Sequence, residues 1–202
     1  MYSLYKSLLQ HYSEYFNTAL QGSWKEAEEQ SIALEDVEST TFTLFVEWLY
    51  TQHLPKATME WYDISGVEPP DENYNYYVTS ALMMVQLYCL ADRFMVPKLC
   101  KELNRVIITE GLETCWLDPD VLTYAYDFLP EWDPVLSYLV DLQASVVGSK
   151  IKDRTQLLPQ GLLIRCVDRY RCMAMDRVLE IVACDYHGHT SEQERRDCQQ
   201  GK

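Results

Sequence analysis

Phosphate-binding and hydrolase motifs are missing from this chain of 202 residues. It contains no G-x-x-x-x-G-K-[ST], G-x-S-x-G, G-x-G-x-x-G or H-E-x-x-H segment, which are the signatures of nucleotide loops, serine hydrolases, dinucleotide folds and zinc peptidases. Only seven glycines are present, and they do not cluster. The single histidines His11 and His53 have no catalytic neighbour in the sequence. We therefore expect no enzyme activity and no catalytic residue.

Basic residues and long hydrophobic runs are also scarce. Lys and Arg number 17 against 31 Asp and Glu, a net charge of −14, which disfavours binding to nucleic acid or to an anionic membrane. The longest apolar stretch, 81–91, ends at Asp92 and falls short of the roughly 20 residues of a membrane span. The first residues do not resemble a signal peptide. We expect a cytoplasmic or nuclear protein.

Cysteines are present but do not suggest a disulfide framework. There are seven, an odd number, and the first five lie mostly within apolar helical patterns, which is typical of buried reduced thiols. The five are Cys89, Cys100, Cys115, Cys166 and Cys172.

Hydrophobic periodicity in the first half predicts helices with one strand. Pro55, Gly66, Pro69 and Pro70 interrupt the pattern, so a loop or insertion is expected at about 53–77. The segment 24–30 is charged and is also expected to be a loop. The elements predicted by spacing are short helices at 5–12 and, capped by Ser13, at 14–20, a strand at 31–34, a helix at 42–50, a buried helix at 81–94 and a helix started by Pro97.

The pattern of the second half predicts helices, joined by a polar connector at 148–155 and followed by a polar tail. Asp118 and Asp133 each precede a proline, the arrangement of a capping residue followed by a first helical position. A further helical pattern covers 162–183, with a break expected near Cys172. The tail, 185–202, is polar and lacks an apolar face.

Four sequence segments of the first half follow one another in a recognisable order. They are YKSLL with SEYF at 5–16, IALED at 32–36, FTLFVEWLYT at 42–51 and LYCLADRFMVPKL at 87–99. In this order and spacing they resemble the BTB/POZ family, and the sequence is most similar to BTB proteins of filamentous fungi that carry an all-helical C-terminal extension.

The resemblance implies an α+β fold that is mostly α-helical: a BTB/POZ-like helical cluster with a small short-stranded sheet, followed by an all-α extension. The expected domains are 1–110 for the BTB/POZ-like part, 111–184 for the helical extension and 185–202 for the tail. Family members usually begin with a β-hairpin. That hairpin is missing before the first helix here, so the domain is expected to be truncated at its N-terminus, and strand-mediated dimerisation is doubtful.

The resemblance also implies a protein–protein interaction module. Many BTB proteins bring substrates to a cullin scaffold in ubiquitin ligases, and these adaptors carry a hydrophobic-x-Glu motif between the second helix and the strand. Trp24 and Glu26 occupy that place, with the alternative that Trp24 folds onto its own domain. A second hypothesis is that the chain is a self-associating, nuclear regulator that binds another BTB chain.

A last pattern, Cys184-x2-His187-x-His189-x8-Cys198, offers two thiols and two imidazoles. Four ligands of these two types suit tetrahedral zinc, so a third hypothesis is a zinc-stabilised interaction module. The alternative is a solvated tail whose histidines bind nothing. No other cofactor is expected.

Overall fold

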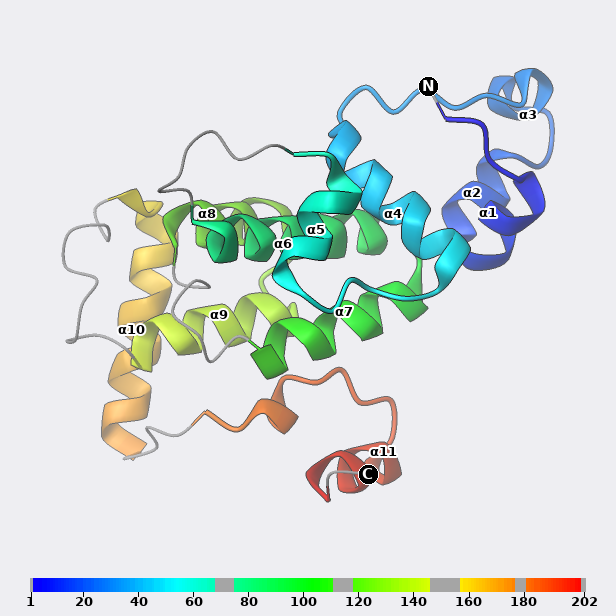
Figure 1. Cartoon of the computed structure of the whole chain (residues 1–202). Coiled ribbons are helices and arrows are strands. Elements are labelled where there is room, and N and C mark those ends of the chain that lie inside the picture. Colours follow the sequence, from blue (N-terminus) through cyan, green and yellow to red (C-terminus); the bar gives the residue numbers. More distant parts are fainter. Residues whose placement is uncertain (1, 68–74, 111–117, 146–156, 177–180, 201–202) are drawn as a thin grey trace. The chain divides into compact units, whose positions relative to one another are not determined.

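The computed structural model describes residues 2–67, 75–110, 118–145, 157–176 and 181–200 (Figure 1). It divides into two compact units, Met1–Leu103 and Asn104–Lys202. Every regular element in the described ranges is helical. The α+β expectation is therefore wrong, because the described residues contain no sheet. No helix in these ranges combines the length and hydrophobicity that a membrane crossing requires.

The first unit contains six complete helices and the start of a seventh. They are α1 (Lys6–Tyr12), α2 (Glu14–Ala19), α3 (Lys25–Glu29), α4 (Ser39–Thr51), α5 (Thr58–Ser65), α6 (Tyr76–Arg93) and α7 (Pro97–Glu110). The second unit contains α8 (Pro119–Phe128), α9 (Pro134–Ser145), α10 (Gln160–Asp176), a short 3-10 helix η3 (Ala183–Asp185) and α11 (Glu192–Gln199).

Helix α6 lies at the centre of the first unit, as its apolar sequence predicts. Its buried residues cover more than half of the helix circumference, while one side with Leu82, Gln86 and Cys89 is half-buried, and α4 and α5 both pack against it. The Asn75 side chain caps its first turn by accepting a hydrogen bond from the Val78 N–H. Because α6 is hydrophobic all round, burial in the middle of a helical cluster is the arrangement that removes most apolar surface from water.

An aromatic cluster joins α2 and α4 to the residue that ends α6. The ring centroids of Phe16 and Phe94 lie 4.7 Å apart, and those of Phe45 and Phe94 lie 5.9 Å apart. All three rings are buried. Ser13 caps α2 by accepting from the Phe16 N–H at 3.1 Å and donates to the Phe94 carbonyl at 2.6 Å, so the predicted cap also ties the two ends of this cluster together.

Three local expectations for the first unit are wrong. Residues 31–34 form no strand, because no segment in the described part of the chain pairs with them. The segment 24–30 contains α3. The expected loop contains α5, whose Trp61 and Tyr62 are buried where the helix packs against α4 and α6. Residues 68–74 of that expected loop lie outside the described residues, and its last two residues belong to α6.

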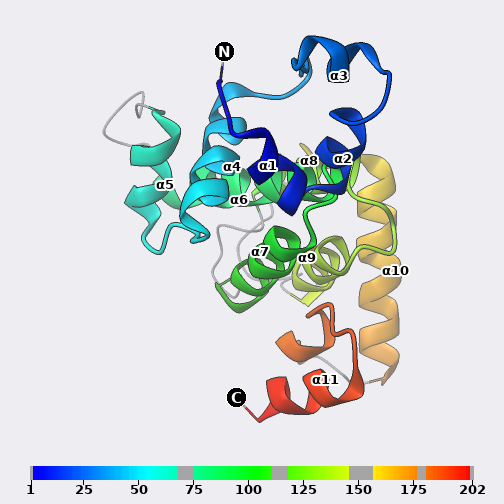
Figure 2. The ribbon, with the colours of Figure 1, turned by 90° about the vertical axis from the view of Figure 1, so that its right-hand side faces the viewer.

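The second unit is built on α9. Asp133 caps it by accepting from the N–H groups of Val135 and Leu136, and Asp118 caps α8 in the same way, as predicted. Helix α10 packs against α9 (Figure 2). It runs unbroken through Cys172, contrary to expectation, because Leu162, Cys166 and Met173 bury one continuous face.

The cysteines only partly follow the expected burial. Cys166 is buried, Cys89 and Cys100 are half-buried, and Cys172 is exposed on α10. Cys115 lies outside the described residues. Burial raises the pKa of the Cys166 thiol to about 11, so this thiol is protonated and unreactive at neutral pH.

Candidate functional site

The predicted cysteine and histidine ligands lie on two short helical elements and the loop between them. Cys184 is in η3, His187 and His189 are in the loop, and Cys198 is in α11. The sequence itself starts α11. Ser191 accepts a hydrogen bond from the Glu194 N–H, and Glu194 Oε2 accepts one from the Thr190 N–H. This is close to a capping box, with the glutamate bonding one residue earlier than usual.

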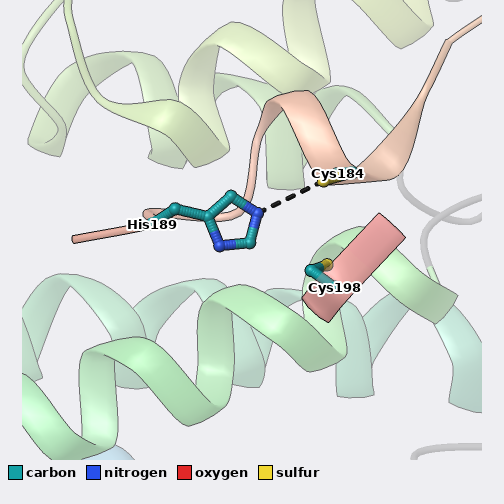
Figure 3. Close-up of side chains that lie close together, drawn as sticks. All are labelled: Cys184, His189 and Cys198. Atoms are coloured by element: carbon teal, nitrogen blue, oxygen red, sulfur yellow. Dashed lines mark hydrogen bonds between the residues drawn. The ribbon is translucent and has the colours of Figure 1, made fainter. Parts of the chain in front are cut away.

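Three of the four ligands form a compact group (Figure 3). The ligand atoms of Cys184, His189 and Cys198 all lie within 4.8 Å of one another. Cys184 Sγ is 3.3 Å from His189 Nε2. His187 is not part of that group, but its Nδ1 lies 3.1 Å from Cys198 Sγ. The structure thus brings the four predicted residues into two sulfur–nitrogen pairs.

The electrostatics of the cluster favour neutral side chains. Burial, and then the neighbouring Cys198, raise the pKa of the Cys184 thiol. Burial, His189 and Arg105 lower the pKa of His187. The Nε2 atom of His187 is also buried without a hydrogen-bond partner among the described residues. Neutral imidazole is the form that binds a metal ion, and a bound metal ion displaces the thiol proton.

A polar network anchors the segment to the rest of the second unit. Tyr186 Oη donates to Asp141 Oδ2 at 2.5 Å, and Arg169 donates to both oxygens of Asp141 at 2.6 and 2.8 Å. The Asn104 side chain donates to the Tyr186 carbonyl at 3.2 Å. The sequence analysis did not predict this network. Its visible signal was a carboxylate within the apolar run of α9, since a carboxylate is rarely buried without a partner.

A hollow of about 520 Å³ opens beside the cluster, lined by residues that include Arg105, His187, Glu194 and Cys198. It gives a small ion a route to two of the four ligands. Arg105 and Glu194 form an ion pair at 3.8 Å across this region. The chemistry that the donor set supports is metal binding, because two thiols and two imidazoles are present together.

The predicted partner-binding pair lies in the first unit. Trp24 precedes α3 and is 63% exposed, and Glu26 is exposed in the first turn of that helix. Both residues line a hollow of about 400 Å³ whose other wall comes from α2 and Met95. Trp24 is therefore largely free of its own domain, and an indole with a neighbouring carboxylate is available at a concave surface.

Comparison with known families finds one match. The family model of the BTB/POZ domain matches residues 2–66. Neither curated proteins nor solved structures give a significant match. The matched range contains four helices before α5 and the whole of α5, as well as Trp24 and Glu26.

Proposed function

We propose that this chain, whose residues 2–66 match the BTB/POZ domain, a protein–protein interaction module, is an adaptor that brings a protein substrate to a cullin scaffold. The adaptor works in the cytosol or the nucleus, where cullin ligases act. The observation that carries the proposal is the exposed Trp24 with Glu26 beside a hollow of the matched domain.

The chemistry of this surface fits a partner with a basic or amphipathic segment. An exposed tryptophan can bind a partner without breaking contacts to its own domain, and it can bury a large apolar area in the interface. Trp is accordingly enriched among interface hot spots. Glu26 can accept a charge-assisted hydrogen bond at the rim. The net charge of −14 adds long-range attraction to a basic partner surface.

The test is binding of the full chain to the N-terminal region of a cullin, measured by calorimetry. We expect Trp24→Ala to weaken binding by about 2 kcal/mol, roughly 30-fold in Kd, and Glu26→Lys to weaken it as well. Trp132→Ala, at an 84% exposed tryptophan of the other unit, and Glu28→Lys, elsewhere on α3, are the matched controls. If the wild type does not bind, or if all four variants bind equally, the adaptor role is lost.

We propose that the substrate binds to α10 in the second unit. One face of α10 is buried, while Ile164 and Val167 on the opposite face are more than half exposed. Exposed aliphatic side chains at i and i+3 are the pattern of a helix that receives a partner. In pull-downs analysed by mass spectrometry, the double variant Ile164→Asp/Val167→Asp should lose the substrate that the wild type captures and should still capture the cullin.

Self-association is a second candidate, supported by an aromatic surface at the start of the chain. Tyr5 is 69% exposed and Tyr50 is 47% exposed, and their ring centroids lie 6.4 Å apart. Such rings can pair across a two-fold axis. Light scattering at micromolar concentration tests this reading: a dimer that Tyr5→Ser disrupts supports it, and a monomer excludes it.

A further inference from the structure

The segment from η3 to α11 has little hydrophobic surface to bury. Among the described residues from 183 to 200, Cys184 is the only buried side chain, and α11 buries none. Helix α11 has eight residues. Isolated helices of this length are marginal in water, and most helices in proteins depend on packing an apolar face. The Arg195–Asp185 ion pair at 2.6 Å joins α11 to η3. Because both side chains are about half exposed, this pair contributes little, and a further interaction would stabilise the segment.

The four cysteine and histidine side chains provide that interaction. In tetrahedral zinc sites the metal lies about 2.0 Å from nitrogen and 2.3 Å from sulfur, so that ligating N and S atoms are about 3.5 Å apart. The two S···N pairs here, at 3.3 and 3.1 Å, come close to this separation. We propose that Cys184, His187, His189 and Cys198 bind one zinc ion, which clamps α11 to η3.

His187 is the ligand that completes the tetrahedron. Its Nδ1 already contacts Cys198 Sγ. The His189 N–H donates to the His187 carbonyl at 2.6 Å in a tight turn centred on Gly188, and the two imidazole centroids are 5.8 Å apart. His187 lies outside the group of ligand atoms within 4.8 Å, so the proposal requires its side chain to move toward the ion. His189 needs no such movement, because it lies within the three-residue group.

The donor set selects zinc among the common metal ions. Thiolates and imidazoles together suit Zn²⁺, whereas Ca²⁺, Mg²⁺ and Mn²⁺ prefer oxygen ligands. Four protein ligands leave no open coordination position, so the ion has a structural role and not a catalytic one. Two thiolates neutralise its charge without a carboxylate. The hollow lined by His187 and Cys198 is the entry path.

A disulfide between Cys184 and Cys198 is the main rival, because their sulfur atoms belong to the same group within 4.8 Å. A disulfide would stabilise the segment in an oxidising environment without using either histidine. Zinc requires reduced thiols and uses all four residues. The two explanations therefore differ in their dependence on His187 and His189.

The experiment uses the full chain, purified under reducing conditions without a histidine tag. Zinc is measured by mass spectrometry of the element, and zinc affinity by competition with a chelator. We expect one zinc per chain. Cys184→Ser and His189→Ala should lower the affinity more than about 100-fold, beyond the effect of losing a residue that only supports a ligand. His187→Ala should do the same. Cys172→Ser and His53→Ala, at exposed positions outside the cluster, should retain full zinc.

A second measurement needs no variant. Cobalt(II) added to the metal-free wild type should give the intense visible bands of a tetrahedral site and sulfur-to-cobalt charge-transfer bands. Metal removal should accelerate hydrogen exchange in α11 and leave α4 and α6 unchanged. Four outcomes would each overturn the proposal: protein that stays zinc-free after incubation with zinc, octahedral cobalt spectra, a Cys184–Cys198 disulfide in peptide maps of the protein as purified under reducing conditions, or equal zinc loss in the control variants.

Discussion

The first unit and the C-terminal segment differ in what stabilises them. In the first unit, the rings of Phe16, Phe45 and Phe94 are buried against one another, and this burial of apolar surface stabilises the packing of the helices. The segment from η3 to α11 buries Cys184 alone among its described residues. Its other contacts are hydrogen bonds, ion pairs, the sulfur–nitrogen pairs and the edge-on packing of the Tyr186 ring against Tyr138 at 5.3 Å.

This difference has consequences for how each region responds to conditions. Burial of aromatic rings is insensitive to metal and to redox state, whereas a Cys/His cluster depends on both. The tail is thus the part of the molecule that chelators or oxidants change first. Between these extremes lies the Asp141 network, where a buried carboxylate attaches the tail through Tyr186.

The largest expected effect comes from opening the aromatic cluster. Phe45 is 0% exposed, and Phe45→Ala removes a whole buried ring, which typically costs about 3–5 kcal/mol. Urea unfolding followed by circular dichroism measures it. Phe128→Ala, at a 63% exposed ring, should stay within about 0.5 kcal/mol of wild type. Equal effects at the two positions would contradict the burial on which the comparison depends.

The next effect comes from the Asp141 network. Asp141→Ala leaves Tyr186 Oη and the Arg169 guanidinium without their acceptor. Breaking a buried ion pair costs about 3–5 kcal/mol, and the half-exposed Arg169 places this one at the low end, about 3 kcal/mol. The same urea assay measures it. The exposed pair Asp168–Arg171 is the control: Asp168→Ala should change stability by less than about 1 kcal/mol.

Much of the fold is visible in the sequence where one signal dominates. The central position of α6 follows from its all-round hydrophobicity, and Ser13, Asp118 and Asp133 cap helices as their positions predict. The Cys/His cluster is also foreseeable, because four soft ligands within 15 positions (184 to 198) can meet once the chain turns.

The remaining features depend on tertiary partners. The strand at 31–34 fails because a strand needs a neighbour to bond its backbone, and alternation of Ile32 and Leu34 does not supply one. Helix α5 was missed because eight residues between prolines show too little periodicity, and it is the burial of Trp61 and Tyr62 that orders it. Asp141 was overlooked because its partners lie 28 and 45 positions away.

Two serine caps test the comparison on a smaller scale. Ser13 is buried and bonds both the Phe16 N–H and the Phe94 carbonyl, so Ser13→Ala should cost about 2 kcal/mol, a lost cap plus an unsatisfied buried carbonyl. Ser191 caps α11 at an exposed site, and Ser191→Ala should cost about 0.5 kcal/mol. Hydrogen exchange should show global loosening for the first and loosening of α11 alone for the second.

The smallest effect is a pH dependence in the first unit. Arg93 donates to both oxygens of Asp36 at 2.8 and 3.0 Å, and these hydrogen bonds hold the pKa of that carboxyl below its ordinary value of 3.8. A carboxylate whose pKa is lowered by folding stabilises the native state above its unfolded pKa, and this contribution disappears as the pH falls through the folded value.

Since both side chains are largely exposed, salt screens the pair and the contribution is small. Thermal unfolding of the wild type and Arg93→Gln should therefore differ slightly at pH 6, and the difference should shrink as the pH falls below 3.8 and vanish once the pH lies below the lowered pKa of Asp36. A difference that persists at low pH would mean that Arg93 stabilises the first unit through its packing on the Phe94 ring, 5.7 Å from the guanidinium carbon. The effect of Arg93 would then come from the aromatic cluster and not from the ion pair with Asp36.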